Sequence, residues 1–289
     1  MVSVCMITYN HELYIRNALD GVVMQKTNFK IELIIGEDCS NDETRKICED
    51  YAAKYPELIQ LLPSDRNLGM SQNGERTLQS CKGEYIALLD GDDYWTDPLK
   101  LQKQVDFLDK HEDYILSFHD VNIQYTRKNN CRSYRMVGSL KENTLGTEDL
   151  IKPWFIPTCS ILYRNLKDIN YPNWISLTDS ADIALMLFLS TLGKFYYLNE
   201  VMGVYRMHDN GISVSYTGYS NIFSKIHLYQ NFNEYTNGKF ETKLHQAMKG
   251  EIQVHLPEFH ELRRLRRSKK VKVIKVIQAI VTKIRDVLG

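Results

Sequence analysis

Three aspartates within four positions are the first residues of this chain that could do chemistry. Asp90, Asp92 and Asp93 directly follow the apolar run 85–89, which is typical of a buried strand. Carboxylates this close together repel one another, and a hard divalent cation bound among their oxygens removes that repulsion. A turn with solvated side chains explains the same residues, because Asp-Gly and Asp-Asp are ordinary turn sequences. The motif alone leaves both interpretations open.

A second set of carboxylates occupies the loop 36–42, which follows another apolar run. A carboxylate can accept the ring N–H of a pyrimidine base, and an aromatic ring such as that of Tyr9 can stack on the base. Asp42 is explained more simply as a helix N-cap. Asp38 is therefore the better candidate for a ligand contact.

The elements that must position these side chains are predicted by alternating apolar runs and amphipathic stretches, which are typical of a mostly parallel α/β sheet. All four apolar runs of the first hundred residues end in polar loops. Ligands of an open α/β sheet bind outside the carboxyl ends of its strands, so these loops should converge. We expect strands over 2–8, 31–36, 58–62 and 85–89, and helices over 12–25, 42–55, 70–80 and 97–111.

The pattern changes after residue 112. We expect antiparallel strands over 114–124 and 133–137, a short strand over 159–163, a helix over 180–192, a strand over 194–197, helical residues over 219–260, and a basic amphipathic helix over 263–288.

The composition is that of a soluble globular protein, with 289 residues, 43% apolar and 25% charged. Six cysteines lack the spacing of a zinc site or a disulfide framework, so we expect free thiols in a reducing cytoplasm. The first residues lack the features of a secretory signal. The longest apolar stretch, 183–189, is far shorter than the roughly 20 residues that cross a bilayer.

Four fragments in order resemble the family-2 glycosyltransferases of the GT-A fold. They are Thr8-Tyr9-Asn10, the loop 37–42, Asn67-Leu68-Gly69, and the segment 89–98 with its Asp motif and Trp95-Thr96-Asp97-Pro98. The resemblance covers about residues 1–215. It implies a GT-A domain with a nucleotide-binding half (1–112) and an acceptor-side half (113–215), followed by a helical extension (216–289). It also implies inverting transfer from a nucleotide sugar, usually a UDP-sugar, with Mg²⁺ or Mn²⁺ bridging the diphosphate and the Asp motif.

The resemblance also implies roles for single residues. Asp38 matches the carboxylate on the base, Asp90 the one near the ribose, and Asp92 the direct metal ligand, while Asp93 supports the metal site or the donor sugar. Family members often have Asp at position 37 and Gly at position 39, where this chain has Glu and Cys. Asn67 also suits a simple turn. Further predicted donor contacts are Thr8, Tyr9, Asn10, Glu37, Asn67, Asn73 and Arg206.

Inversion needs a general base on the acceptor hydroxyl, and a carboxylate held rigidly at the start of a helix suits this task. Asp182 stands where the family has its base, at the matching spacing from Gly193-Lys194 and from the Tyr-Arg-x-His element that ends at His208. Asp179 is the alternative base, and Asp182 also suits a first helical turn without any catalytic role. His208 is predicted to contact the metal or the diphosphate. Trp95 and Trp154 are candidate platforms for a sugar ring.

The C-terminal segment from Glu261 carries ten basic and two acidic residues and an apolar stripe at helical spacing. A basic face beside an apolar face favours an anionic membrane surface, so we expect a cytoplasmic enzyme on the inner face of the cell membrane, beside a lipid-linked acceptor. Packing on the domain or a homodimer is the alternative. Non-specific nucleic-acid binding is the least favoured, and no nucleic-acid partner is expected.

These features favour a glycosyltransferase of cell-surface polysaccharide or lipid-linked oligosaccharide synthesis. A sugar nucleotidyltransferase has the same architecture, but it normally has a Gly-rich basic loop after the first strand, where this chain has Tyr9-Asn10-His11-Glu12. A non-catalytic carbohydrate-binding module is the second alternative.

Overall fold

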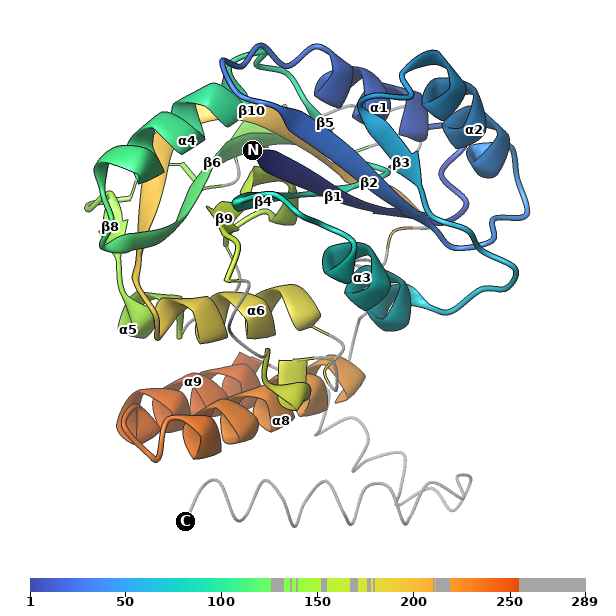
Figure 1. Cartoon of the computed structure of the whole chain (residues 1–289). Helices are drawn as coiled ribbons and strands as arrows, with labels where there is room; N and C mark the ends of the chain where they lie inside the picture. Colours follow the sequence, from blue (N-terminus) through green and yellow to red (C-terminus); the bar gives the residue numbers. More distant parts are fainter. Residues whose placement is uncertain are drawn as a thin grey trace, which may run out of the picture.

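The computed structural model describes residues 1–125, 133–135, 137–138, 140–151, 155–166, 171–175, 178, 180–209, 211 and 219–254. Within these residues a ten-stranded mixed sheet has the order β3-β2-β1-β4-β9-β6-β10-β5, with β7 paired to β6 and β8 to β10. Helices cover both faces of the sheet (Figure 1). The strands are β1 (Val2–Thr8), β2 (Ile31–Glu37), β3 (Ile59–Leu61), β4 (Tyr85–Asp90), β5 (Tyr94–Trp95), β6 (Tyr114–Tyr125), β7 (Ser133–Arg135), β8 (Thr144–Leu145), β9 (Leu162–Arg164) and β10 (Lys194–Met207).

The helices follow from the amphipathic stretches of the sequence. They are α1 (Ile15–Val23), α2 (Thr44–Lys54), α3 (Met70–Gln79), α4 (Lys100–Lys110), α5 (Thr147–Leu150), α6 (Ala181–Ser190), α8 (Tyr219–Tyr235) and α9 (Glu241–Val254), with short 3₁₀ turns at η2 (Thr158–Ser160) and η3 (Asn173–Ile175). None of the described helices is long and apolar enough to span a membrane. The predicted basic helix over 263–288 lies outside the described residues.

The parallel half of the sheet is confirmed as predicted. The central strand β1 pairs in parallel with β2 and β4, and β2 pairs in parallel with β3. The register places Thr8 beside Glu37 and Ile7 beside Asp90, so the carboxyl ends of three strands share one edge. The predicted loops therefore do converge.

Two apolar cores lie on opposite faces of this sheet. Alternate β1 residues such as Val4 and Met6 pack with α1, α2 and α4 in the first core. Cys5 and Ile86 belong to the second core, which also contains Leu187 of α6 and Phe232 of α8. Because successive side chains of a strand point to opposite faces, a parallel strand that is buried on both faces needs apolar residues at odd and at even positions. Helices α8 and α9 thus share a core with α6 (Figure 1).

Two predicted strand boundaries are wrong. The strand expected over 194–197 runs for 14 residues as β10, because register shifts between Leu198 and Gly203 accommodate the polar residues at which the pattern breaks. The strand expected over 159–163 is β9 at Leu162–Arg164, and residues 158–160 form η2 after Pro157. The two-residue strand β5 is too short to give a periodic pattern.

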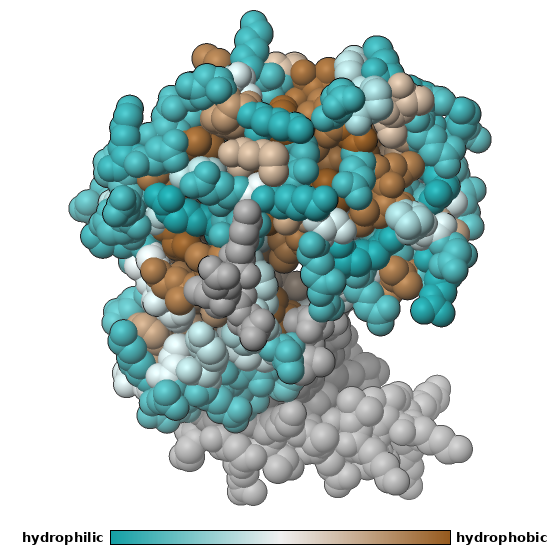
Figure 2. All heavy atoms as spheres, in the orientation of Figure 1, coloured by the Kyte–Doolittle hydropathy of each residue, from teal (hydrophilic) through white to brown (hydrophobic). Residues whose placement is uncertain are grey.

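The face drawn in Figure 2 is largely hydrophilic over the described residues, with smaller apolar areas between the polar side chains. The cysteines within the described part, at positions 5, 39, 48, 81 and 159, are free thiols as predicted. Cys131 lies outside it.

Lys100 at the start of α4 is a fully buried cation. Its Nζ lies 4.0 Å from the centroid of the Trp95 ring and has no hydrogen-bond partner among the described residues. Burial lowers the pKa of Lys100 from 10.5 to about 7. The unfolded chain therefore binds one more proton than the folded chain between pH 7 and 10.5, and the cost of Lys100 is largest below pH 7.

Lys100→Met should raise the free energy of unfolding at pH 6.5 by on the order of 2–5 kcal/mol, because it removes this cost and fills a similar volume. Its advantage over the wild type should shrink as the pH rises towards 10.5. Urea unfolding across this pH range measures both effects, with Lys110→Met at the exposed end of α4 as the matched control. A variant that is no more stable than the wild type at pH 6.5 would contradict this account.

Candidate active site at the carboxyl edge of the sheet

Two of the predicted metal-site residues are in contact. Asp92 follows β4 and His208 follows β10, and the distance from His208 Nε2 to Asp92 Oδ2 is 3.0 Å. His11, in the loop after β1, lies with its Nε2 3.8 Å from the same carboxylate oxygen. One ligand atom from each of the three residues lies within 4.8 Å of the other two. His11 was assigned no role from the sequence, because its neighbours in the chain do not distinguish it from the other histidines.

This group of donors fits a divalent cation. Burial lowers the pKa of His11, although the Asp92 carboxylate opposes the shift, so its imidazole is neutral and can act as a ligand. Burial opposes ionisation of Asp92, but its hydrogen bond with His208 and its electrostatic interactions with His11 and His208 lower its pKa overall. An ionised carboxylate beside imidazole nitrogens is a common set of metal ligands.

Asp93 lies deeper than Asp92, whereas Asp90 is half-buried like Asp92. Burial raises the pKa of Asp90 to about 8, with further contributions from the nearby carboxylates of Asp92 and Asp182. Asp93 is 1% exposed, and its Oδ1 accepts the backbone N–H of Arg206 at 2.8 Å. Burial raises the pKa of Asp93 well above its usual range. Asp93 thus fastens the loop after β4 to strand β10.

Arg206, a predicted donor contact, uses its guanidinium for hydrogen bonds within the protein, one of them to the same loop. Its Nη1 donates to the backbone carbonyl of Asp92 at 2.7 Å, and its Nη2 donates to Asn17 Oδ1 at 2.8 Å. The guanidinium lies 4.3 Å from the centroid of the Tyr94 ring and 5.3 Å from that of Tyr14. The Tyr14 ring also lies 4.6 Å from the His208 ring. Arg206 therefore holds the Asp92 loop in place.

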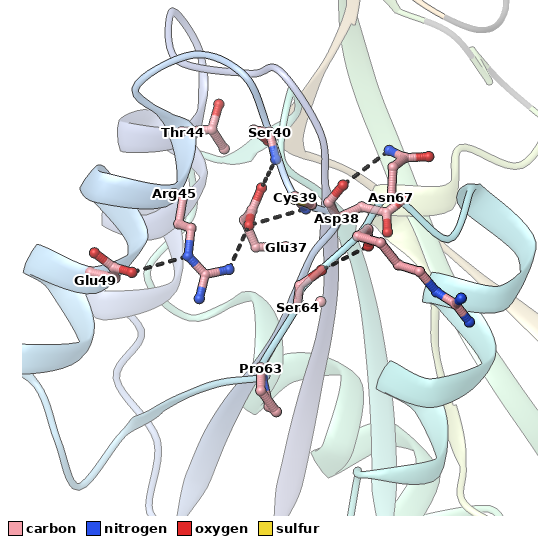
Figure 3. A network of polar contacts seen from close by, with 12 residues as sticks. Glu37, Asp38, Cys39, Ser40, Thr44, Arg45, Glu49, Pro63, Ser64 and Asn67 are labelled. Carbon is pink, nitrogen blue, oxygen red and sulfur yellow. Dashed lines mark hydrogen bonds and ion pairs between the residues drawn. The ribbon is translucent and has the colours of Figure 1, made fainter.

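Asp38 joins two loops of the same edge (Figure 3). Its carboxylate accepts the backbone N–H groups of Leu68 at 2.8 Å and Gly69 at 2.9 Å, and Asn67 Nδ2 donates to its backbone carbonyl at 3.0 Å. Gly69 has a φ of +81°, a conformation that favours glycine. An ionised carboxylate has about four acceptor sites, of which these two bonds use two, and Asp38 as a whole is 3% exposed.

Glu37 has internal partners as well. Its side chain is buried and pairs with Arg45 at 3.1 Å, and it accepts the backbone N–H groups of Cys39 and Ser40 (Figure 3). Cys39 has a φ of +59°, which explains why glycine suits this position. The N-cap of α2 is Glu43 and not Asp42 as predicted, but Asp42 Oδ1 accepts the backbone N–H of Thr44, the first residue of the helix, at 2.9 Å.

The remaining predicted donor contacts include both buried and exposed side chains. Asn73 is 2% exposed, and its amide accepts from Arg76 and donates to the Gly36 carbonyl, so it ties α3 to β2. Asn10 Oδ1 accepts the backbone N–H of residue 41 at 2.9 Å. Tyr9 is 39% exposed and keeps ring surface free at this edge. The Thr8 hydroxyl lies 3.2 Å from His11 Nδ1.

Asp182 lies in the first turn of α6, where its Oδ2 accepts the Thr158 hydroxyl at 3.3 Å. Burial raises the pKa of Asp182. Asp182 lies close enough to Asp90 for its charge to raise the pKa of that carboxyl, so it belongs to the same edge as the Asp motif. The alternative base Asp179 lies outside the described residues, as does Trp154. The prediction that Trp95 stacks on a sugar is wrong, because Trp95 is 2% exposed.

This fold and this edge define an α/β protein of the GT-A type. The sequence profile of Glycosyl transferase family 2 matches residues 3–169. The chain therefore belongs to Glycosyl transferase family 2.

Individual relatives agree with this assignment. The chain is 38% identical over 211 residues to the uncharacterised protein Rv1520 of Mycobacterium tuberculosis, and this match covers 73% of the chain and 60% of that protein. The chain thus spans less than two thirds of that relative. It is 28% identical over 216 residues to the putative teichuronic acid biosynthesis glycosyltransferase TuaG of Bacillus subtilis, over 74% of the chain and 81% of TuaG.

Among solved structures, residues 1–349 of S. aureus TarS in complex with UDP-GlcNAc match with a TM-score of 0.57 at 19% identity. The match covers 87% of this chain and 80% of that chain. At this identity the likeness establishes the fold alone. It confirms the predicted GT-A fold.

Proposed function

We propose that the protein transfers a sugar with inversion from a UDP-sugar to a saccharide acceptor, in the synthesis of a cell-surface polysaccharide. The observation that carries the proposal is the meeting, at one sheet edge, of a His–Asp–His group with the Asp38 loop and with Asp182. One edge of the sheet thus carries candidate groups for three functions. They are binding the donor diphosphate, recognising the base and deprotonating the acceptor.

Asp92 and His208 hold a divalent cation, Mn²⁺ or Mg²⁺, in this proposal. A bound cation supplies positive charge that neutralises the diphosphate as it leaves. Two hydrogen bonds fix the position of this site: Arg206 Nη1 donates to the backbone carbonyl of Asp92, and the backbone N–H of Arg206 donates to the Asp93 carboxylate. Burial, and after it the carboxylates of Asp92 and Asp182, raise the pKa of Asp90, and a cation bound there would relieve the repulsion between these carboxylates.

Asp182 is the general base. Its ionised carboxylate accepts the proton of the acceptor hydroxyl while that oxygen bonds to the anomeric carbon. The bond from that carbon to the donor phosphate breaks on the opposite face, and the nucleoside diphosphate leaves with the electron pair, so the anomeric configuration inverts. The hydroxyl of Thr158 orients the carboxylate by its hydrogen bond to Oδ2.

The base of the nucleotide is read at the Asp38 loop. The two acceptor sites left on the Asp38 carboxylate suit the ring N–H of uracil, and the exposed ring of Tyr9 suits stacking on it. Uracil carries such a ring N–H, which can donate to a remaining lone pair of the carboxylate. UDP-sugars are therefore the proposed donors.

The proposed acceptor is a growing or lipid-linked saccharide. The likeness to TuaG, whose name refers to teichuronic acid biosynthesis, supports an anionic or other cell-surface polysaccharide. The basic segment 263–288 supports a site of action beside an anionic membrane on its cytoplasmic face.

A panel of UDP- and GDP-sugars, tested for donor hydrolysis and transfer with and without Mn²⁺, tests the function as a whole. We expect turnover of one UDP-sugar that requires the metal. Pyrophosphate release from a nucleoside triphosphate and a sugar phosphate would instead favour a nucleotidyltransferase, and the absence of any turnover would favour a binding module.

A further inference from the structure

We propose that His11 is a third protein ligand of the cation, and that two imidazole nitrogens beside one carboxylate make the site select a first-row transition ion such as Mn²⁺ over Mg²⁺. This inference rests on the proposed function, because it assigns the cation class of the same site. Three loops then close on one ion: the loop after β1, the Asp motif after β4, and the turn after β10.

The positions of the donor atoms support a single shared ion. Asp92 Oδ2 lies 3.0 Å from His208 Nε2 and 3.8 Å from His11 Nε2, and all three donors lie within 4.8 Å of one another. Atoms bound to one ion at about 2.1 Å are separated by roughly 3–4 Å. His11 thus needs only a small side-chain rotation to complete the group.

The surroundings of His11 orient its free nitrogen toward Asp92. The Thr8 hydroxyl lies 3.2 Å from His11 Nδ1 and can accept its N–H, which leaves the Nε2 lone pair for a metal. A Cβ atom on Gly91 would lie 2.3 Å from Thr8 Oγ1 and 3.0 Å from His11 Nδ1. The loop after β4 therefore needs glycine at this position for Thr8 and His11 to approach the Asp motif. A hydrogen bond that fixes the ring of a ligating histidine is a usual companion of a metal site.

The type of donor atom decides which cation binds. Mg²⁺ strongly prefers oxygen ligands and keeps much of its water shell. Imidazole nitrogen suits first-row transition ions, whose affinities rise from Mn²⁺ towards Cu²⁺. A second nitrogen ligand should therefore raise the affinity for Mn²⁺ more than the affinity for Mg²⁺, and His11 is the residue that supplies it.

Metal binding to the full chain tests this inference without reference to turnover. Mn²⁺ alone is titrated and followed by its electron paramagnetic resonance signal, and Mg²⁺ is measured by competition. His11→Ala should weaken Mn²⁺ binding by about tenfold or more, and Mg²⁺ binding by less than about threefold. His11→Gln keeps an oxygen donor at a similar reach, so it should lower the Mn²⁺-to-Mg²⁺ affinity ratio by about tenfold while retaining Mg²⁺. His227→Gln, on the exposed side of α8, is the matched control.

Pulsed electron paramagnetic resonance counts the nitrogens bound to Mn²⁺ directly. The wild type should show two imidazole nitrogens, and His11→Ala and His208→Ala one each. If His11→Ala binds Mn²⁺ within twofold of the wild type and leaves the nitrogen signal unchanged while His208→Ala loses it, the third ligand is refuted and the metal-dependent function stands. If the wild type binds no Mn²⁺ even with UDP present, both proposals fail.

Discussion

Asp92→Asn should lower metal-dependent sugar transfer by about 10³-fold at saturating donor and at Mn²⁺ levels that saturate the wild type. The amide has the size of the carboxylate, but it lacks the negative charge that attracts the cation. It also lacks the carboxylate oxygen that both His11 and His208 approach. The fold should survive, because Arg206 bonds the backbone carbonyl of Asp92 and not its side chain. Steady-state transfer assays across a Mn²⁺ titration measure the loss.

Asp106→Asn, an exposed change on α4, is the control for the loss of one negative charge. The circular dichroism spectrum and the midpoint of thermal unfolding of Asp92→Asn should stay close to those of the wild type. If Asp92→Asn transfers sugar at the wild-type rate with the same Mn²⁺ dependence, Asp92 is not a ligand of the cation.

Asp182→Asn should reduce transfer by on the order of 10²–10⁴-fold while the affinity for UDP changes little. Asparagine keeps the contact with Thr158, but it cannot take a proton from the acceptor hydroxyl. Single-turnover transfer and UDP binding, measured on the same preparation, separate the two effects. A variant that loses UDP binding in parallel with transfer would indicate a donor-side role for Asp182.

The pH dependence of transfer gives a second test of Asp182. Burial raises its pKa, and a general base must be ionised, so transfer should decline on the acid side at a pH above the usual Asp pKa of about 4. Asp179→Asn distinguishes the alternative base. A wild-type rate in Asp182→Asn together with a large loss in Asp179→Asn would move the base to Asp179.

The order of the elements was predictable because it depends on local patterns. Strands β1, β2 and β4 carry apolar residues on both faces, which is the pattern of a parallel strand buried on both sides, and each ends in a polar residue. The side of the sheet on which the loops meet then follows from topology alone. The pairing of Asp92 with His208, 116 positions apart, needed the additional information of family resemblance.

The features that sequence reasoning missed depend on contacts between distant residues. No local property distinguishes His11 from the other histidines, since its role comes from the approach of Asp92 and Thr8. Nothing in the Asp38 loop indicates that its carboxylate already binds the N–H groups of Leu68 and Gly69. The full length of β10 was hidden because its irregular pairing with β6 interrupts the alternation.

The division of the apolar interior into two cores has a consequence for how such an enzyme diversifies. The helix that carries Asp182 shares its core with α8 and α9, whereas α1 and α2, beside the loops after β1 and β2, pack on the opposite face. Substitutions in α8 and α9 can therefore shift the helix that carries the proposed base without changing the packing of α1 and α2. Under the proposed function, this separation would allow the acceptor specificity to change during evolution while the donor site is retained.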